Sequence, residues 1–340
     1  MLPNLFTRAS STRLNGDLMK LATVLTPVSD VNLQLAAQCG VTDLVYRYYG
    51  TDGSVLKAAI ARAASFGLRI ACIEGYLPIE RLKIGIDDGT EIAAMTRLLE
   101  QMSEFGVSLL CYNFMAGTDW ARTRVDAPER GGAKVTAFDL EDVERAKLLG
   151  HRPTDAVHEE ITRSRAAADL WGYLDHMLTS LLPVAERCGV TLAMHPDDPP
   201  LPMLLGKPRI MHNVAAFEEL VRRFNSPRSK ICFCQGTFAT MGVDIPATIR
   251  RLGTHIAYVH FRDVKGTPER FAETFHDNGP TDMAAAMRAL VEVGFDGPMR
   301  PDHVPQMVGE DDGEPGYTML GRLFAYGYIR GLMHASGANS

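Results

Sequence analysis

The 340-residue chain has no apolar run as long as the roughly 18 to 20 residues of a membrane span. Its start, MLPNLFTRASSTRLNGD, lacks the apolar core of a secretory signal. Both absences predict a cytoplasmic protein without a membrane partner. Runs of one charge are missing too, and a formal net charge of −6 spread along the chain argues against nucleic acid as a partner. We expect the partner to be a small molecule.

Cysteine is sparse, and no two cysteines have the CxxC spacing that is typical of structural zinc sites. Several cysteines lie inside apolar runs, so the pattern predicts buried thiols or metal ligands rather than a disulfide framework. A reducing compartment is consistent with this use of cysteine. The six cysteines are Cys39, Cys72, Cys111, Cys188, Cys232 and Cys234.

Short apolar runs rich in Val, Ile and Leu alternate with longer amphipathic stretches. This alternation is typical of parallel strands that are buried on both faces and covered by crossover helices. Eight such runs predict an α/β fold, a (β/α)8 TIM barrel built as a single domain over residues 1–340. The strands are expected at residues 21–26, 43–47, 69–75, 108–114, 191–195, 230–234, 256–260 and 298–302.

Two segments depart from the repeating pattern. Residues from about 115 to 155, with GGAK near the middle, are too polar and irregular for a crossover helix, and we expect an active-site excursion or lid after strand four. The stretch 316–335, GYTMLGRLFAYGYIRGLMHA, predicts an extra C-terminal helix, followed by a loose tail at about 335–340. No repeat or linker marks a domain boundary.

Side chains that commonly bind metal ions close the last four predicted strands: His195, Cys234, His260 and Asp302. The strand ends of such a barrel face the active site, so these side chains should converge. One histidine at a strand end is more often structural than a ligand, but four such ends in succession favour a metal site. Imidazole, thiolate and carboxylate together suit a borderline divalent cation, which would act as a Lewis acid if coordination positions stay open.

Cys232 competes with Cys234 for the ligand role. It lies two residues earlier on the same strand, so its side chain should face the same side one layer deeper in the barrel. Cys234 is preferred because it lies at the strand end. The alternative for both is a pair of buried core thiols.

His303 follows Asp302 directly, where a cation and carboxylates could tune an imidazole for proton transfer. Its alternative role is that of a loop histidine behind the ligands. Tyr317 opens the last predicted helix, and its phenol could give or take a proton if that segment folds over the barrel mouth. A tyrosine at a helix start more often packs and caps.

Four further groups are candidates near the barrel mouth. Asp197 and Asp198 follow His195 and could orient it, or they could begin the turn that the next two prolines enforce. Arg122 has the fork needed for a bidentate grip on a carboxylate, although loop arginines are ordinarily solvated. Lys83, after strand three, has the same two interpretations.

The order of motifs resembles that of the mannonate dehydratase family, and the likeness runs from about Glu74 to Met333. The resemblance implies a TIM barrel related in fold to xylose isomerase. It also implies dehydration of D-mannonate to 2-keto-3-deoxy-D-gluconate with Mn²⁺ or Fe²⁺, within hexuronate catabolism. It also implies a homodimer or a higher homo-oligomer. The motifs are CYNFMAGTDWARTR, MHPDDPP, CFCQGTF, YVHFRDV, MRPDH and PGYTMLGRL.

The resemblance also implies roles for single residues. The four strand-end side chains match the family's metal ligands, and its catalytic His and Tyr correspond to His303 and Tyr317. This chain has Val304 where the family usually has glycine, and CQGTF where Cys-x-Gly-Ser-Leu is usual, both on loops that shape the pocket. The candidates for holding the sugar acid are Lys83, Tyr112, Asn113, Arg122 and Asp198.

Two other functions compete with a metal-dependent sugar-acid dehydratase. One is an isomerase or epimerase of the xylose-isomerase type, whose sites favour carboxylates and histidines, so a thiolate at Cys234 argues against it. The other is a barrel that has lost its activity and only binds ligands. The presence of all four metal-ligand side chains together with His303 and Tyr317 argues against that possibility.

Overall fold

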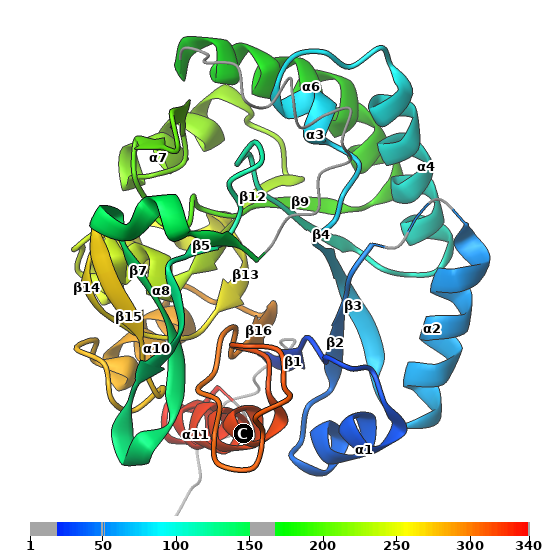
Figure 1. Ribbon diagram of the computed structural model, residues 1–340. Helices are drawn as coiled ribbons and strands as arrows, with labels where there is room; N and C mark the ends of the chain where they lie inside the picture. The colour runs from blue at the N-terminus through cyan, green and yellow to red at the C-terminus, as the bar shows by residue number, and fades with distance from the viewer. Residues whose placement is uncertain (1–18, 49, 51, 150–166, 339–340) are drawn as a thin grey trace, which may run out of the picture.

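The computed structural model describes residues 19–48, 50, 52–149 and 167–338 and contains a closed barrel of eight parallel strands (Figure 1). The strands follow one another around the barrel in chain order, and β16 pairs with β1 to close it. Each coincides with a predicted strand to within a few residues, which confirms the predicted fold class. The barrel strands are β1 (Lys20–Thr23), β2 (Asp43–Tyr46), β3 (Arg69–Glu74), β4 (Leu109–Tyr112), β9 (Thr191–Met194), β12 (Ser229–Cys234), β13 (Ile256–His260) and β16 (Pro298–Arg300).

The barrel wall separates two apolar clusters of different character. Large aliphatic and aromatic side chains on the outer face pack against the helices and form the main core. The interior holds a smaller cluster of small side chains, thiols and a few aromatic rings, among them Ala193, Cys232 and Tyr258. Because strand side chains alternate, Cys232 and Cys234 both face this interior, opposite Tyr258 and His260 of β13 in register.

Helices cover the outside of the barrel, as Figure 1 shows for α1, α2, α4 and α6. Several begin at residues whose side chains accept a backbone N–H, such as Ser29, Asn213 and Asp244. No helix in the described ranges is long and apolar enough to cross a membrane. The helices are α1 (Asp30–Gln38), α2 (Gly53–Ser65), α3 (Glu80–Lys83), α4 (Thr90–Glu104), α6 (Ala167–Cys188), α7 (Val214–Arg223), α8 (Gln235–Thr240), α9 (Ile245–Leu252), α10 (Met283–Glu292) and α11 (Met319–Ala335).

The predicted C-terminal helix is present as α11, and the described residues after it stay close to its end. The backbone N–H of Ala338 donates to Met333 O at 2.9 Å, and Ala338 is buried against the main core. The structure therefore differs from the predicted loose tail up to residue 338, and residues 339–340 lie outside the described part of the chain.

The segment after β4, which the sequence predicts to be an active-site excursion or lid, forms antiparallel strands. Strand β7 pairs with β6 on one side and, on the other, with β15 of the hairpin that follows the seventh barrel strand. This gives a four-stranded sheet in the order β14-β15-β7-β6, of which Figure 1 labels β14, β15 and β7. Residues 150–155 of the predicted excursion lie outside the described residues. The added strands are β5 (Ala121–Arg122), β6 (Arg124–Pro128), β7 (Lys134–Asp139), β8 (Lys147–Leu148), β14 (Val264–Thr267) and β15 (Arg270–Glu273).

The added sheet has an apolar cluster of its own, in which the rings of Phe138 and Phe271 stack with centroids 5.9 Å apart. Phe138 is 1% exposed. We expect Phe138→Ala to lower the free energy of unfolding by about 3 kcal/mol, because it leaves a cavity that the sheet cannot close. Denaturant titration measures the change. Leu140→Ala, on the same segment but exposed, should change stability by less than about 0.5 kcal/mol, and equal losses in the two variants would contradict the interpretation.

Candidate active site

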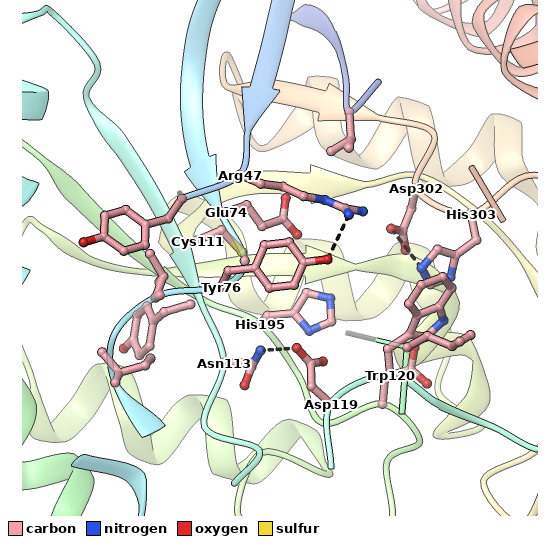
Figure 2. Close-up of a pocket in the computed structure, with 18 of the residues that line it drawn as sticks. Arg47, Glu74, Tyr76, Cys111, Asn113, Asp119, Trp120, His195, Asp302 and His303 are labelled. Atoms are coloured by element: carbon pink, nitrogen blue, oxygen red, sulfur yellow. Dashed lines mark hydrogen bonds and ion pairs between the residues drawn. The ribbon is translucent and has the colours of Figure 1, made fainter. Parts of the chain in front are cut away.

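A cavity of about 390 Å³ opens at the carboxyl ends of the barrel strands, where TIM-barrel enzymes place their active sites (Figure 2). Its walls come from the loops after most of the barrel strands and from the start of the C-terminal segment. The polar and aromatic residues that line it include Arg47, Glu74, Tyr76, Lys83, Tyr112, Asn113, Asp119, Trp120, His195, Asp198, Arg300, Asp302, His303 and Tyr317.

The four predicted metal ligands lie together at this cavity, and two of them, His195 and Asp302, line it. Donor atoms of His195, Cys234 and His260 all lie within 4.8 Å of one another. Asp302 Oδ2 lies 3.7 Å from Cys234 Sγ and 3.6 Å from His260 Nδ1. Both ring nitrogens of His260 are buried and have no hydrogen-bond partner among the described residues. Buried imidazole nitrogens without a hydrogen bond, next to a thiol and carboxylates, suit a divalent cation, so the residues fit a metal ion.

Polar donors surround the sulfur of Cys234. Thr237 Oγ1 donates to Cys234 Sγ at 3.1 Å, and Arg262 Nη2 lies 3.6 Å from the same atom. Such donors stabilise a thiolate, the form that binds a metal. Cys232 lies one layer deeper in the apolar interior cluster instead.

Two arginines hold Asp302 in its ionised form. Arg262 Nε donates to Asp302 Oδ2 at 2.5 Å, and Arg300 Nη1 lies 2.8 Å from Oδ1. Burial opposes ionisation, but these cations and the neighbouring histidines hold the pKa of Asp302 well below its usual range. The backbone of Asp302 has a φ of 59°, in the left-handed region, which is unusual for a residue other than glycine. Such strain is concentrated at functional sites.

Arg47 directly follows β2 and Glu74 ends β3, and both were missed by the sequence reasoning. Glu74 Oε1 lies 3.3 Å from His260 Nε2 and accepts a hydrogen bond from Arg300 at 2.9 Å. Arg47 Nη1 donates to the phenol of Tyr76 at 3.1 Å (Figure 2). The rule that selected the later strand ends would have found both residues if it had been applied to the early strands as well.

The imidazole of His303 is held on two sides. Its Nδ1 lies 3.0 Å from Glu273 Oε1, and its ring stacks on Trp120 with centroids 4.2 Å apart. Glu273 ends β15 in the added sheet, and no sequence motif pointed to it. Burial lowers the pKa of His303, although the adjacent carboxylates Asp302 and Glu273 oppose the shift. The imidazole is therefore neutral at neutral pH.

Tyr317 completes an aromatic group with His303 and Trp120, whose ring centroids lie 5.5 and 5.4 Å from that of Tyr317. The guanidinium carbons of Arg47 and Arg322 lie 4.9 and 4.8 Å from the centre of the Tyr317 ring. Burial raises the pKa of Tyr317, with Arg300 acting in the opposite direction. The phenol therefore keeps its proton at neutral pH.

A further wall of the cavity is polar. Lys83 Nζ donates to Glu80 Oε1 at 2.6 Å and to Asn113 Oδ1 at 2.9 Å. The amide of Asn113 donates to Asp119 Oδ2 at 2.8 Å, as Figure 2 shows. Tyr112 lines the cavity and is almost fully buried. The structure thus brings the predicted residues Lys83, Tyr112 and Asn113 to the cavity.

Arg122 does not reach the cavity, and the predicted contact with a substrate carboxylate needs correction. It is fully buried, and its fork donates to both carboxylate oxygens of Asp198, at 2.8 and 2.9 Å. It also donates to Glu273 at 2.7 Å and to Thr136 at 3.2 Å. Arg122 does bind a carboxylate in bidentate geometry, but that carboxylate belongs to Asp198 of the protein and not to a substrate. Asp198 borders the cavity while its carboxylate binds Arg122 and Arg262.

Asp197 fixes the loop after β9 rather than the ring of His195. Its Oδ2 accepts the backbone N–H of Met211 at 2.7 Å. His195 Nδ1 lies 2.7 Å from the carbonyl oxygen of Pro196 instead. With Nδ1 acting as the donor to that carbonyl, Nε2 keeps its lone pair for a ligand bond.

The barrel and the donor cluster define the class of the protein: a TIM-barrel enzyme with metal-binding side chains at the carboxyl ends of its strands. A family model described as "D-mannonate dehydratase (UxuA)" matches residues 25–339. The chain belongs to this mannonate dehydratase family, whose members are hydro-lyases.

Curated relatives and solved structures agree with this assignment. Mannonate dehydratase 2 of Halalkalibacterium halodurans is 31% identical over 79% of this chain and 83% of the relative. The mannonate dehydratase of Enterococcus faecalis is 32% identical over 80% of this chain and 83% of its own. The crystal structure of mannonate dehydratase from Streptococcus suis serotype 2 matches with a TM-score of 0.84 and 28% identity, covering 95% of both chains.

Other solved barrels share the fold alone. A xylose isomerase domain protein from Planctomyces limnophilus matches with a TM-score of 0.58 at 14% identity, over 94% of this chain and 98% of its own. At this level of identity the likeness concerns the TIM-barrel fold alone.

Asp119 gives the cavity a measurable pH dependence. Burial raises the pKa of its carboxyl to about 6, against the opposing influence of Lys83 and His195. In the unfolded chain this pKa is about 3.9, so the folded state favours the protonated form. The stability that Asp119 contributes is therefore present below about pH 4 and lost as the pH rises through about 6.

We expect Asp119→Asn to remove this loss. As the pH rises from 4 to 7, the free energy of unfolding of the variant should increase by about 1 to 2 kcal/mol relative to that of the unsubstituted protein. Urea denaturation of the metal-free protein at both pH values measures the gain. An unchanged difference between the two proteins would show that Asp119 titrates normally.

Proposed function

We propose that the protein is a metal-dependent dehydratase that converts D-mannonate to 2-keto-3-deoxy-D-gluconate and water. The observation that carries the proposal is that His303 and Tyr317 line the same cavity as His195 and Asp302, which cluster with Cys234 and His260. Membership of the mannonate dehydratase family supports the same substrate. Loss of the C2 proton and the C3 hydroxyl requires one group that takes a proton and another that gives one.

The proposed metal ligands are His195, Cys234, His260 and Asp302, and the proposed ion is Mn²⁺ or Fe²⁺. Bound to the substrate's oxygens, such an ion supplies Lewis acidity that acidifies the C2 proton. The mixture of nitrogen, sulfur and carboxylate donors suits a borderline divalent cation. A homo-oligomer and a cytoplasmic location stay predictions from the sequence and from the resemblance.

His303 is the proposed base. The carboxylate of Glu273 can only accept, so Nδ1 of His303 carries the proton in the 3.0 Å contact between them. The other ring nitrogen, Nε2, then holds a lone pair, and it lies 3.7 Å from Asp302 Oδ1, beyond hydrogen-bond distance. A neutral imidazole with a free Nε2 at the cavity wall can accept the C2 proton.

Tyr317 is the proposed acid. Because burial raises its pKa, the phenol is protonated and can donate to the departing C3 hydroxyl. Arg47 and Arg322 lie against the ring, and their positive charge stabilises the phenolate that donation leaves behind. The rings of His303 and Tyr317 are close enough to act on neighbouring carbons of one substrate.

The walls offer partners for the remaining oxygens of a sugar acid. Lys83 and Arg47 provide positive charge for the carboxylate, and Asn113 and Tyr112 provide polar groups for hydroxyls. Asp198 forms part of the cavity wall beside the substrate, and its carboxylate is bound to Arg122 and Arg262. The isomerase alternative gains no support from barrels that are under 25% identical, since they share only the fold.

The ligand assignment predicts opposite outcomes for neighbouring cysteines. We expect Cys234→Ser to lose most of its bound Mn²⁺, because serine does not replace a thiolate, and Cys232→Ser to retain it. Metal analysis of both proteins after dialysis against Mn²⁺ measures this. If Cys232→Ser lost the metal while Cys234→Ser kept it, the ligand would lie one layer deeper than proposed.

The proton-transfer roles predict losses in kcat rather than in metal content. We expect His303→Asn and Tyr317→Phe each to lower kcat by about 10² to 10⁴-fold, the range for loss of general acid–base catalysis. Tyr326→Phe is the matched control, because Tyr326 lies on α11, buried against Thr23 and outside the cavity lining. Steady-state assays with equal Mn²⁺ loading make the comparison, and a kcat unchanged in either site variant would remove that residue from the mechanism.

A panel of aldonates tests the proposed substrate. The Mn²⁺-loaded protein should form a 2-keto-3-deoxy acid from D-mannonate faster than from any other member, as measured by a colour assay for such acids. Formation of the product from a different aldonate alone would change the substrate but keep the reaction class. Isomerisation of an aldose or ketose without any dehydration would overturn the proposal.

A further inference from the structure

A second group of metal-ligand side chains lies in the barrel interior beside the catalytic donors. The sulfur atoms of Cys111 and Cys232 and a ring nitrogen of His260 all lie within 4.8 Å of one another. Both thiols belong to the interior apolar cluster. His260 belongs to both groups, so it lies between two sets of soft donors.

The fold explains why these two thiols meet. Cys111 of β4 and Cys232 of β12 lie on either side of β9, whose inward residue Ala193 is paired with Cys111 in register. All three residues belong to the interior apolar cluster and are almost fully buried. A methyl group at position 193 leaves the space through which the two sulfur atoms approach each other.

We propose that Cys111, Cys232 and His260 form a binding site for a soft divalent cation such as Zn²⁺ or Cd²⁺, which shares His260 with the catalytic donor set. Neither cysteine has a role in the proposed dehydration. The proposal does not depend on the substrate, because it concerns metal binding by the protein alone.

The geometry is close to what such an ion requires. With metal–sulfur bonds of about 2.3 Å and metal–nitrogen bonds of about 2.0 Å, ligand atoms of a tetrahedral site lie roughly 3.3 to 3.8 Å apart. The three donor atoms already lie within 4.8 Å of one another, so shifts of about an ångström in the side chains suffice. A ring nitrogen of His260 would exchange its contact with a carboxylate, Glu74 Oε1 at 3.3 Å or Asp302 Oδ2 at 3.6 Å, for a bond to the ion.

The surroundings select the kind of ion. Two thiolates balance the charge of a divalent cation, so the site adds no net charge to an apolar layer. Thiolate pairs favour Zn²⁺ and Cd²⁺, whereas Mn²⁺ prefers oxygen and nitrogen donors. Since His260 is shared and two divalent cations repel at short range, a soft ion bound here weakens binding at the catalytic donors.

Cd²⁺ titration of the metal-free, fully reduced protein tests the site, because each thiolate bound to Cd²⁺ adds ultraviolet charge-transfer absorption. Of the three thiols in the two donor groups, Cys234→Ser keeps Cys111 and Cys232, and the double variant Cys111→Ser/Cys232→Ser keeps Cys234. We expect Cys234→Ser to absorb about twice as strongly at saturation as the double variant. Cys72→Ser is the matched control, since Cys72 lies in the same cluster but outside the donor group.

Absorption of the double variant equal to that of the unsubstituted protein would overturn the proposal, as would no absorption in Cys234→Ser. If the double variant does not fold, ¹¹³Cd NMR of the unsubstituted protein decides the question. A resonance shifted to the range of two sulfur ligands is expected, and resonances with at most one sulfur would contradict the site. Both readouts are independent of dehydratase activity, so failure of one proposal does not imply failure of the other.

Discussion

The arrangement of the site depends on one buried guanidinium, that of Arg262. It donates to Asp302 at 2.5 Å, to Glu273 at 2.7 Å and to Asp198 at 3.1 Å. A single planar cation thereby holds a proposed metal ligand, the carboxylate that orients His303 and the acid that anchors the added sheet. The space it occupies exists because residue 236 is glycine, where a Cβ would lie 2.4 Å from Arg262 Nη1. Removing one partner would leave a buried charge uncompensated, which is costly, so the group stays together as a unit.

This network explains why the barrel carries an extra sheet. Glu273 ends β15, which pairs with β7 of the segment that follows β4, and Arg122 at the start of that segment binds Glu273. Trp120 from the same segment stacks on His303. The added strands therefore fix the orientation of the proposed base from two sides, whereas the barrel strands supply the metal donors. Positioning by rigid elements is what proton transfer requires, because small displacements of a catalytic group are costly.

The sequence predicted the eight barrel strands and the convergence of four donor side chains, and both predictions rest on local pattern. Apolar runs identify buried strands, and the carboxyl ends of parallel strands must meet at one edge. Arg47 and Glu74 lie at the carboxyl ends of the second and third barrel strands and obey the same rule. Glu273 could not have been found in this way, since its importance comes from pairing between segments more than a hundred residues apart.

The sequence by itself determined the barrel, the strand-end donor set and the family motifs, because period, strand length and residue type are local properties. Only the tertiary structure decided which charged side chains form ion pairs with one another inside the protein. Arg122 has the fork for a substrate carboxylate, yet folding places it 2.8 Å from Asp198 and leaves it fully buried. Nothing in the neighbouring residues distinguishes the two outcomes. A buried ion must take its partners from whichever segments the fold brings against it, and those segments are distant in sequence.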